Sequence, residues 1–214
     1  MQEKIEIIDP TVPIEGAAPA YLVHPLNSSA LADRLLLDKV LLIDFGTSFF
    51  FESIPSSVEA PAQYAPPELL YKTPLSPAID QWTLGCLLFE ICTGYCIFKM
   101  MFNCQNDVMK DTVSMIGRPP ERMWKMWEER GRYFEEDGTP LVNTKKVPVV
   151  PYSLKARIID ISRLYIDNNV TKAGQEFPTK ELEDMYDLLA QVLVYEPASR
   201  LSLDKCLEHP FLAV

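Results

Sequence analysis

The chain has 214 residues, 48% of them hydrophobic and 23% charged, which is enough apolar content for the core of one large domain or two small ones. Its formal net charge of −10 argues against nucleic acid as a partner and is compatible with a basic peptide. Its longest apolar runs, such as Leu84 to Phe89, are far shorter than the roughly 18 residues of a membrane helix, and its first residues show no signal-peptide pattern. We therefore expect an intracellular protein, cytoplasmic or nuclear, without a membrane segment.

The cysteines favour reduced thiols over disulfides or a metal site. They are odd in number, and only two histidines are present to complete a metal site. They are Cys86, Cys92, Cys96, Cys104 and Cys206. Cys92 and Cys96 are four residues apart and could share a helix face, but no third or fourth zinc ligand lies near them in the sequence. The interpretation is buried, reduced thiols and no zinc site.

The first 37 residues are expected to form a linker or insert-like segment. Prolines and small residues punctuate residues 1–30, which suits an extended segment that crosses a surface. A short helix is expected over 31–37. The main domain is then expected over 38–214.

A short β-hairpin is expected next. Residues 40–43 have strong strand character and run into Asp44-Phe45-Gly46, and a second strand is expected over 48–51. An aspartate at the end of a strand, held by a flexible glycine, is a common way to aim a carboxylate at a metal ion. A plain turn containing Asp and Gly is the simpler interpretation.

The segment from Ser76 to Gly94 has the strongest helical pattern. Ser76 can cap its start, Pro77 suits its first turn and Gly94 suits its end. Its interior is apolar on nearly every face, apart from Thr83 and Glu90. A helix that is apolar all round is typical of the centre of a core, so other helices are expected to pack around this one.

The rest of the chain is expected to consist of helices and loops. Further helices are expected over 106–115, 120–130, 180–194 and 203–208, and loops over 52–64 and 131–153. The predicted fold class is therefore mainly α.

Four separate stretches resemble, in order, the lower half, or C-lobe, of a eukaryotic protein kinase domain. They are Asp-Phe-Gly at 44–46, YAPPELL at 64–70, DQWTLGCLLFEICTG at 80–94 and DLLAQVLVYEPASRLSLDKCLEHPFL at 187–212. The resemblance covers about residues 38–212. It implies a kinase C-lobe fold and membership of the serine/threonine protein kinases, which transfer phosphate from ATP with the help of Mg²⁺.

The resemblance also implies roles for individual residues. Asp44 would be a magnesium ligand, and with Phe45 and Gly46 it would form part of the ATP site. Further residues match structural motifs of the family: Glu68, Asp80, Trp82, Gly85 and Arg200. In the family the glutamate pairs with the late arginine, and a bidentate pair of Glu68 with Arg200 would join the activation segment to the last helices. The alternative is two exposed charges without mutual contact.

A narrower resemblance is to the SR-protein kinase branch and its fungal relatives. It rests on LLIDFGTSFF at 41–50, SMIGRPPERMW at 114–124 and YFEEDGTPL at 133–141. Such kinases phosphorylate serines in Arg/Ser-rich proteins, and an acidic surface would suit an arginine-rich substrate. The candidate residues for this surface are Glu128, Glu129, Glu135, Glu136 and Asp137. A solvated acidic face without a ligand is the alternative.

Several parts of a working kinase domain are absent from the sequence. The eight glycines contain no G-x-G-x-x-G, both histidines precede a proline, and no asparagine follows an aspartate at the spacing of the family's catalytic loop. In addition, Ala60 stands where the family has a threonine that helps to fix the catalytic aspartate. We therefore expect a truncated C-lobe that is inactive alone. The apolar surface near Val40, Leu42 and Phe45 would be exposed in such a lobe and would favour self-association.

Three interpretations follow from these observations. The chain is a fragment or truncated product of a kinase, a non-catalytic module that keeps the lobe's surface for binding basic peptides, or an unrelated helical protein with accidental motifs. A Gly-rich loop and a catalytic loop encoded upstream of Met1 would favour the enzyme, and a stop codon there would favour the binding module.

Overall fold

The computed structural model describes residues 4–6, 21–23, 41–50, 52–99, 105–141, 152–167 and 179–213. The chain divides into two compact units, Met1–Phe45 and Gly46–Val214. The helix expected over 31–37 lies outside the described residues. The division into a linker over 1–37 and a lobe over 38–214 stays a prediction.

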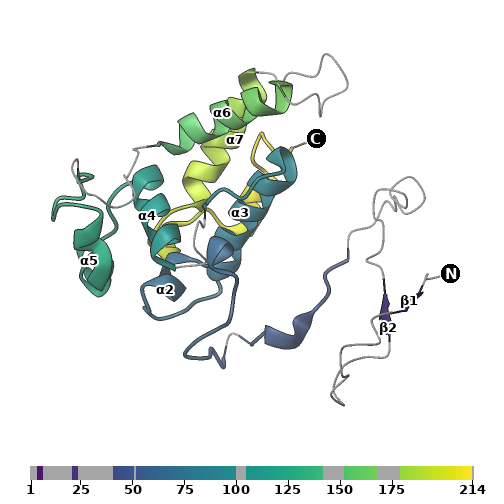
Figure 1. Ribbon diagram of the computed structural model, residues 1–214, viewed down its shortest axis with the longest axis horizontal. Coiled ribbons are helices and arrows are strands. Elements are labelled where there is room, and N and C mark those ends of the chain that lie inside the picture. The colour runs from purple at the N-terminus through teal and green to yellow at the C-terminus, as the bar shows by residue number, and fades with distance from the viewer. Residues whose placement is uncertain are drawn as a thin grey trace. The chain divides into compact units, whose positions relative to one another are not determined.

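The first unit contains a pair of short strands that the sequence analysis did not predict. Strand β1 (Lys4–Glu6) pairs antiparallel with β2 (Tyr21–Val23), with Ile5 opposite Leu22 (Figure 1). The expected linker therefore includes a piece of β-structure. Three residues per strand is short, and a two-stranded ribbon of this size is marginally stable at best in water.

The β-hairpin predicted around Asp44 is not formed, and this prediction was wrong. Residues 41–44 and 48–50 form no strand, and Phe45–Thr47 is a short 3-10 helix. Asp44 has a φ of 63°, in the left-handed region, which interrupts an extended run. The apolar pattern of Leu42 and Ile43 does not lead to burial either, because both side chains are 82% exposed.

The described residues of the second unit form helices joined by loops, with one isolated β-bridge between Phe134 and Pro140. Its α-helices are α2 (Pro67–Leu70), α3 (Ile79–Thr93), α4 (Gln105–Ile116), α5 (Glu121–Met126), α6 (Leu154–Asp167), α7 (Thr179–Val192) and α8 (Leu203–Leu207). Short 3-10 helices lie at Ala62–Tyr64, Glu128–Arg132 and Pro197–Ser199. The mainly α fold class is thus confirmed at this level. No helix among the described residues is both long and apolar enough to cross a bilayer.

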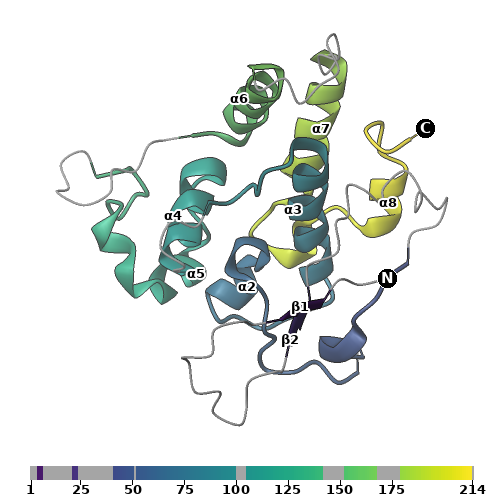
Figure 2. The ribbon, with the colours of Figure 1, turned by 45° about the vertical axis from the view of Figure 1, so that its right-hand side comes forward.

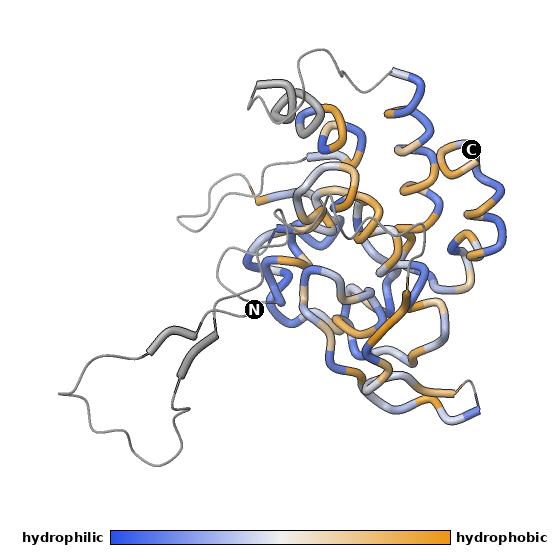
Figure 3. The backbone as a smooth tube through the Cα atoms, turned by 90° about the vertical axis from the view of Figure 1, so that its right-hand side faces the viewer, coloured by the Kyte–Doolittle hydropathy of each residue, from blue (hydrophilic) through white to orange (hydrophobic). Residues whose placement is uncertain are grey.

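Helix α3 is the centre of the second unit. Helices α6 and α7 pack against it, and α7 runs beside it in Figures 1 and 2. Its buried face carries Trp82 and Phe89, both fully buried. Figure 3 shows apolar and polar residues alternating along the helices of this unit, as expected for helices with one face turned to a shared core.

One expectation about α3 was wrong, because the helix is not buried all round. Leu87 and Ile91 are 45% and 70% exposed. These two residues are one turn apart and share a face. Among the described residues, the elements that pack on α3 cover its other sides.

The remaining helices follow the predictions with two exceptions. The helix expected over 120–130 ends at Met126, and Glu128–Arg132 continues as a 3-10 helix. Helix α6 was not predicted. The Ser153 hydroxyl accepts a hydrogen bond from the Ala156 backbone N–H at its start, which is the N-terminal capping arrangement that helices favour.

Candidate functional site

The centre of the site is a buried ion pair between Glu68 and Arg200. Arg200 Nη1 donates to Glu68 Oε1 at 2.8 Å, and Nη2 donates to Oε2 at 2.6 Å. Both side chains are fully buried. The pairing expected from the sequence is therefore present, and the alternative of two exposed charges is excluded. Both carboxylate oxygens are satisfied by one planar guanidinium, which is the strongest form of this contact.

Arg200 also binds three backbone carbonyl oxygens in two segments of the chain. Its guanidinium donates to the carbonyl oxygens of Ala78 at 2.7 Å, Val194 at 2.9 Å and Tyr195 at 3.4 Å. These acceptors lie at the start of α3 and just after α7. With Glu68 in α2, one side chain thus connects three helices that are distant in sequence, and all of its charge is neutralised inside the protein.

The other motif residues surround this pair on α3. Trp82 packs its ring 5.4 Å from the Arg200 guanidinium and stacks on Phe98 at 5.4 Å. Gly85 lies against α7, where a Cβ atom would come within 3.1 Å of Leu193 Cδ2. Asp80 is exposed in the first turn of α3, where the helix dipole stabilises a negative charge.

A cluster around Tyr64 was missed by the sequence analysis. The Tyr64 hydroxyl donates to Glu90 Oε2 at 2.5 Å, and the Cys96 thiol lies 3.7 Å from both groups. The Thr83 hydroxyl lies 3.4 Å from the Tyr64 carbonyl oxygen. The hydrogen bond to Glu90 is the main cause that raises the pKa of Tyr64. The signal was present, because Thr83 and Glu90 are the polar interruptions of the apolar α3.

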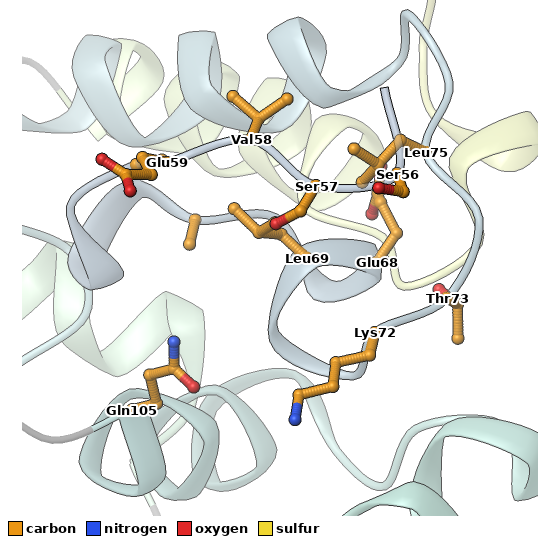
Figure 4. Close-up of a pocket in the computed structure, with 12 residues that line it drawn as sticks. Ser56, Ser57, Val58, Glu59, Glu68, Leu69, Lys72, Thr73, Leu75 and Gln105 are labelled. Atoms are coloured by element: carbon orange, nitrogen blue, oxygen red, sulfur yellow. The ribbon is translucent and has the colours of Figure 1, made fainter. Parts of the chain in front are cut away.

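A cavity of about 640 Å³ is lined in part by helix α2 and by Ala65, the residue after Tyr64. Figure 4 shows its walls: the segment from Ser56 to Ala60, helix α2, and the turn that carries Lys72. Gln105, the first residue of α4, faces the same space. The Glu68 carboxylate is held by Arg200, so Lys72 and Glu59 are the charges of the lining that remain free to meet a ligand.

Two features of this cavity bear on its chemistry. Lys72 has a φ of 53°, a left-handed conformation that a lysine rarely adopts. Ala60 offers only a methyl group to the cavity, where the resembled family has a hydroxyl. The lining contains neither a histidine nor an aspartate, and of its two carboxylates Glu68 is held by Arg200, which leaves Glu59 as its free acid–base group.

Asp44, the candidate magnesium ligand, belongs to the first unit. Its carboxylate is exposed, as are Phe45 and Gly46. Among the described residues, no three His, Cys, Asp or Glu side chains come together as a metal site would require. A single exposed carboxylate does not fit the octahedral shell that Mg²⁺ demands. We therefore derive no step through ATP or magnesium from these residues.

The cysteines form no metal site in the described part of the chain. Cys86 and Cys206 are buried, and Cys92 and Cys96 are half-buried free thiols. Burial is the main cause that raises the pKa of Cys86 and of Cys206. Both thiols are thereby kept protonated and poorly nucleophilic at neutral pH. Cys104 lies outside the described residues.

The candidate acidic surface lies on the 3-10 helix after α5 and on the loop that follows it. Two of its five carboxylates are already paired: Glu129 with Arg132, and Glu136 with Arg130. Hydrogen bonds from Thr139, first from its side chain, lower the pKa of Asp137. Glu128, Glu135 and Asp137 carry the charges that remain unpaired among the described residues. The surface is therefore less acidic than its sequence suggests.

A family model and the similar proteins all point to protein kinases. The family model described as "protein kinase domain" matches residues 32–212 of the chain. The chain is 28% identical over 182 residues to dual specificity protein kinase CLK2 of Mus musculus, covering 81% of this chain and 32% of the relative. It is 28% identical over 177 residues to serine/threonine-protein kinase AFC3 of Arabidopsis thaliana, covering 80% of this chain and 40% of the relative.

A third similar protein is dual specificity protein kinase lkh1 of Schizosaccharomyces pombe, 26% identical over 182 residues, with 81% of this chain and 24% of the relative covered. The chain thus spans between 24% and 40% of the length of these three curated relatives. None of the three is named as an SR-protein kinase, so the narrower resemblance to that branch stays a prediction.

Proposed function

Because this chain belongs to the protein kinase domain family, we propose that it supplies the C-lobe of a kinase that phosphorylates serines of proteins with ATP. The observation that carries the proposal is the Glu68–Arg200 pair, since it ties the activation segment to the last helices. In this proposal the segment 38–214 is the lobe and the residues before it are an insert. The residues 1–214 transfer no phosphate alone, because the sequence contains neither a Gly-rich loop nor a catalytic-loop base.

The chain's own residues have a positioning role in this proposal. Arg200 holds Glu68, and Glu68 lies on the helix that forms one wall of the 640 Å³ cavity. The cavity lies beside the activation segment, so it is suited to hold a side chain of the protein substrate. Positioning of this kind is a large part of what a protein contributes to phosphoryl transfer.

The proposed substrate is Arg/Ser-rich, as in the SR-protein kinase branch. Glu128, Glu135 and Asp137 are exposed and form no ion pair among the described residues, so they are free to meet arginines. Rim charges of this kind contribute more to association rate and selectivity than to affinity. We therefore propose a weak, salt-sensitive contact.

A second candidate function is a non-catalytic module that binds basic peptides. The cavity and the free carboxylates form without any catalytic base in the sequence, and this favours the second candidate as well. Peptide binding does not depend on catalysis in this candidate, because the residues that line the cavity are present while the Gly-rich loop and the catalytic base are absent from the sequence.

The test combines catalysis with binding on the same preparation. Radiolabelled phosphate transfer from ATP to an Arg-Ser peptide is measured beside an Asp44→Ala variant, and binding of the same peptide is followed by fluorescence anisotropy. We expect no transfer by residues 1–214, weak binding that weakens in salt, and loss of binding in a Glu128→Gln, Glu135→Gln variant. Transfer that vanishes in Asp44→Ala would overturn the inactive-lobe proposal. Absence of binding would remove the proposed substrate contact.

A further inference from the structure

Two cavities adjoin each other along helix α7. One has a volume of about 560 Å³ and lies between the end of α4, the start of α6 and α7. The other, of about 460 Å³, lies between α7 and the start of α8. Ala190 and Val194 line both cavities. The two cavities therefore form one groove, which we call the α7 groove, and its midpoint is the small, exposed side chain of Ala190.

The charges of the α7 groove are all positive. The lining of the two cavities contains Lys155, Arg200 and Lys205 and no carboxylate. Arg200 is neutralised by Glu68. Lys155 and Lys205 are both exposed and form no ion pair among the described residues, one at each end of the groove.

Two acidic side chains near the α7 groove, Asp187 and Glu196, already have partners. Asp187 lies 3.0 Å from His209 Nε2 and also accepts a hydrogen bond from Gln191. Glu196 pairs with Arg122. These carboxylates therefore compete weakly for the two lysines, which keep their capacity to bind an anionic ligand.

The floor of the first cavity is apolar, whereas the second cavity is lined by Ala190, Val194 and Leu201 together with polar residues. Leu154, Leu193 and Tyr195 are buried residues of the first cavity, and the Tyr195 hydroxyl is occupied by the Gly117 carbonyl at 2.7 Å. Lys155 Nζ lies 5.8 Å from the centre of the Tyr186 ring, so the ring holds the cation at the rim. Apolar pockets with a few polar groups at the edge are the usual form of a ligand site.

We propose that the α7 groove docks an extended peptide segment of a partner protein, in which apolar side chains alternate with acidic ones. In an extended chain successive side chains point to opposite sides. The apolar ones can then enter the first cavity and lie against Val194 and Leu201 in the second, while the acidic ones reach Lys155 and Lys205. The protein as a whole carries a net charge of −10, so general electrostatic attraction does not recruit an acidic peptide, and binding reports the local lysines.

The test uses the full 214-residue chain and a fluorescein-labelled peptide of alternating Glu and Leu, about ten residues long so that it can span both cavities. Anisotropy titrations compare the parent with a double variant, Lys155→Glu combined with Lys205→Glu, and with Ala190→Trp. The tryptophan replaces an exposed alanine, and its side chain would fill the midpoint of the α7 groove. The charge control is Lys125→Glu, the same substitution at a single exposed lysine of α5 outside the groove, and it is compared with Lys155→Glu and Lys205→Glu made one at a time as well as together. Circular dichroism checks that each variant is folded.

We expect the parent to bind the probe, the double lysine variant to lose about tenfold in affinity, and Ala190→Trp to weaken it by a similar factor. Lys125→Glu should bind as the parent does, and an Arg-Ser peptide should not displace the probe. No binding by the parent, or an equal loss in Lys125→Glu, would overturn the proposal. Displacement by the Arg-Ser peptide would also contradict it, because the probe would then lie on the substrate surface.

Discussion

The hydroxyl of Tyr64 donates a 2.5 Å hydrogen bond to Glu90, which lies on the otherwise apolar central helix α3. The two residues come from different elements, the short 3-10 helix before α2 and the second half of α3. The contact joins the Glu90 carboxylate to Tyr64, which lies four residues before Glu68 in the chain. The polar interruption of α3 is therefore explained by a partner outside the helix.

The first prediction concerns the buried ion pair. Arg200→Ala leaves the Glu68 carboxylate buried without its partner and should lower the free energy of unfolding by about 3 to 5 kcal/mol. Arg200→Lys should cost less than Arg200→Ala, because an ammonium keeps the charge but cannot make the bidentate contact. Urea unfolding followed by circular dichroism measures both.

The control for this prediction is a surface pair. Arg122 and Glu196 form an ion pair with both side chains more than one third exposed, so Arg122→Ala should cost only about 0 to 1 kcal/mol. Equal urea midpoints for Arg200→Ala and Arg122→Ala would mean that burial of the Glu68–Arg200 pair has no energetic consequence.

The second prediction concerns the end of α3. Gly94 has a φ of 74° and closes the helix through a hydrogen bond from its N–H to the Glu90 carbonyl. No atom would obstruct a side chain there, so Gly94→Ala tests the backbone conformation alone and should cost about 1 kcal/mol. Gly131→Ala is the matched control: its surroundings are equally open and its φ is not left-handed. A thermal shift in Gly131→Ala as large as in Gly94→Ala would refute the explanation.

The third prediction is a loss of stability at alkaline pH. Burial is the main cause that raises the pKa of Tyr152 to about 12, and it also raises the pKa of Tyr71 and of Tyr195. In the unfolded chain these phenols ionise near pH 10 while the folded protein keeps them neutral. The unfolded state then binds fewer protons, so the contribution of these phenols to stability is constant below about pH 10 and falls as the pH rises toward 12.

Melting temperatures between neutral pH and pH 11, with tyrosinate absorbance recorded in parallel, measure this effect. Tyr152→Phe removes one of the shifted phenols and should make the alkaline decline shallower than in the parent. A parent melting temperature that does not change across this range, or a steeper decline in Tyr152→Phe, would contradict the assignment.

The fourth prediction concerns self-association through the exposed apolar run before the 3-10 helix. This run consists of Leu41, Leu42, Ile43 and Phe45, all exposed. A contiguous apolar patch of this kind favours association, so Leu42→Lys, Ile43→Lys should reduce the apparent mass at high concentration in sedimentation velocity. Leu207→Lys removes an apolar side chain that is 72% exposed on α8 and should leave the apparent mass unchanged. A parent chain that is monomeric at every concentration would rule out this role.

Several local features could be predicted from the sequence. The end of α3 at Gly94 follows from a residue that tolerates a left-handed conformation, and the helical periods of α4, α7 and α8 follow from their apolar spacing. The start of α3 was less accurate. The helix begins at Ile79, and the Ser76 hydroxyl accepts from the Ala78 N–H in the turn before it.

Sequence alone determined the mainly α fold, the family, and the identity of the Glu68–Arg200 pair, because helix ends and motif order are local properties of the chain. Only the tertiary structure decided that Leu42, Ile43 and Ile91 are exposed, since an apolar residue becomes buried only where another element covers it. It also decided that Glu129 and Glu136 are neutralised by neighbouring arginines. Burial and charge pairing depend on which distant residues fold together, and that information is not contained in local spacing.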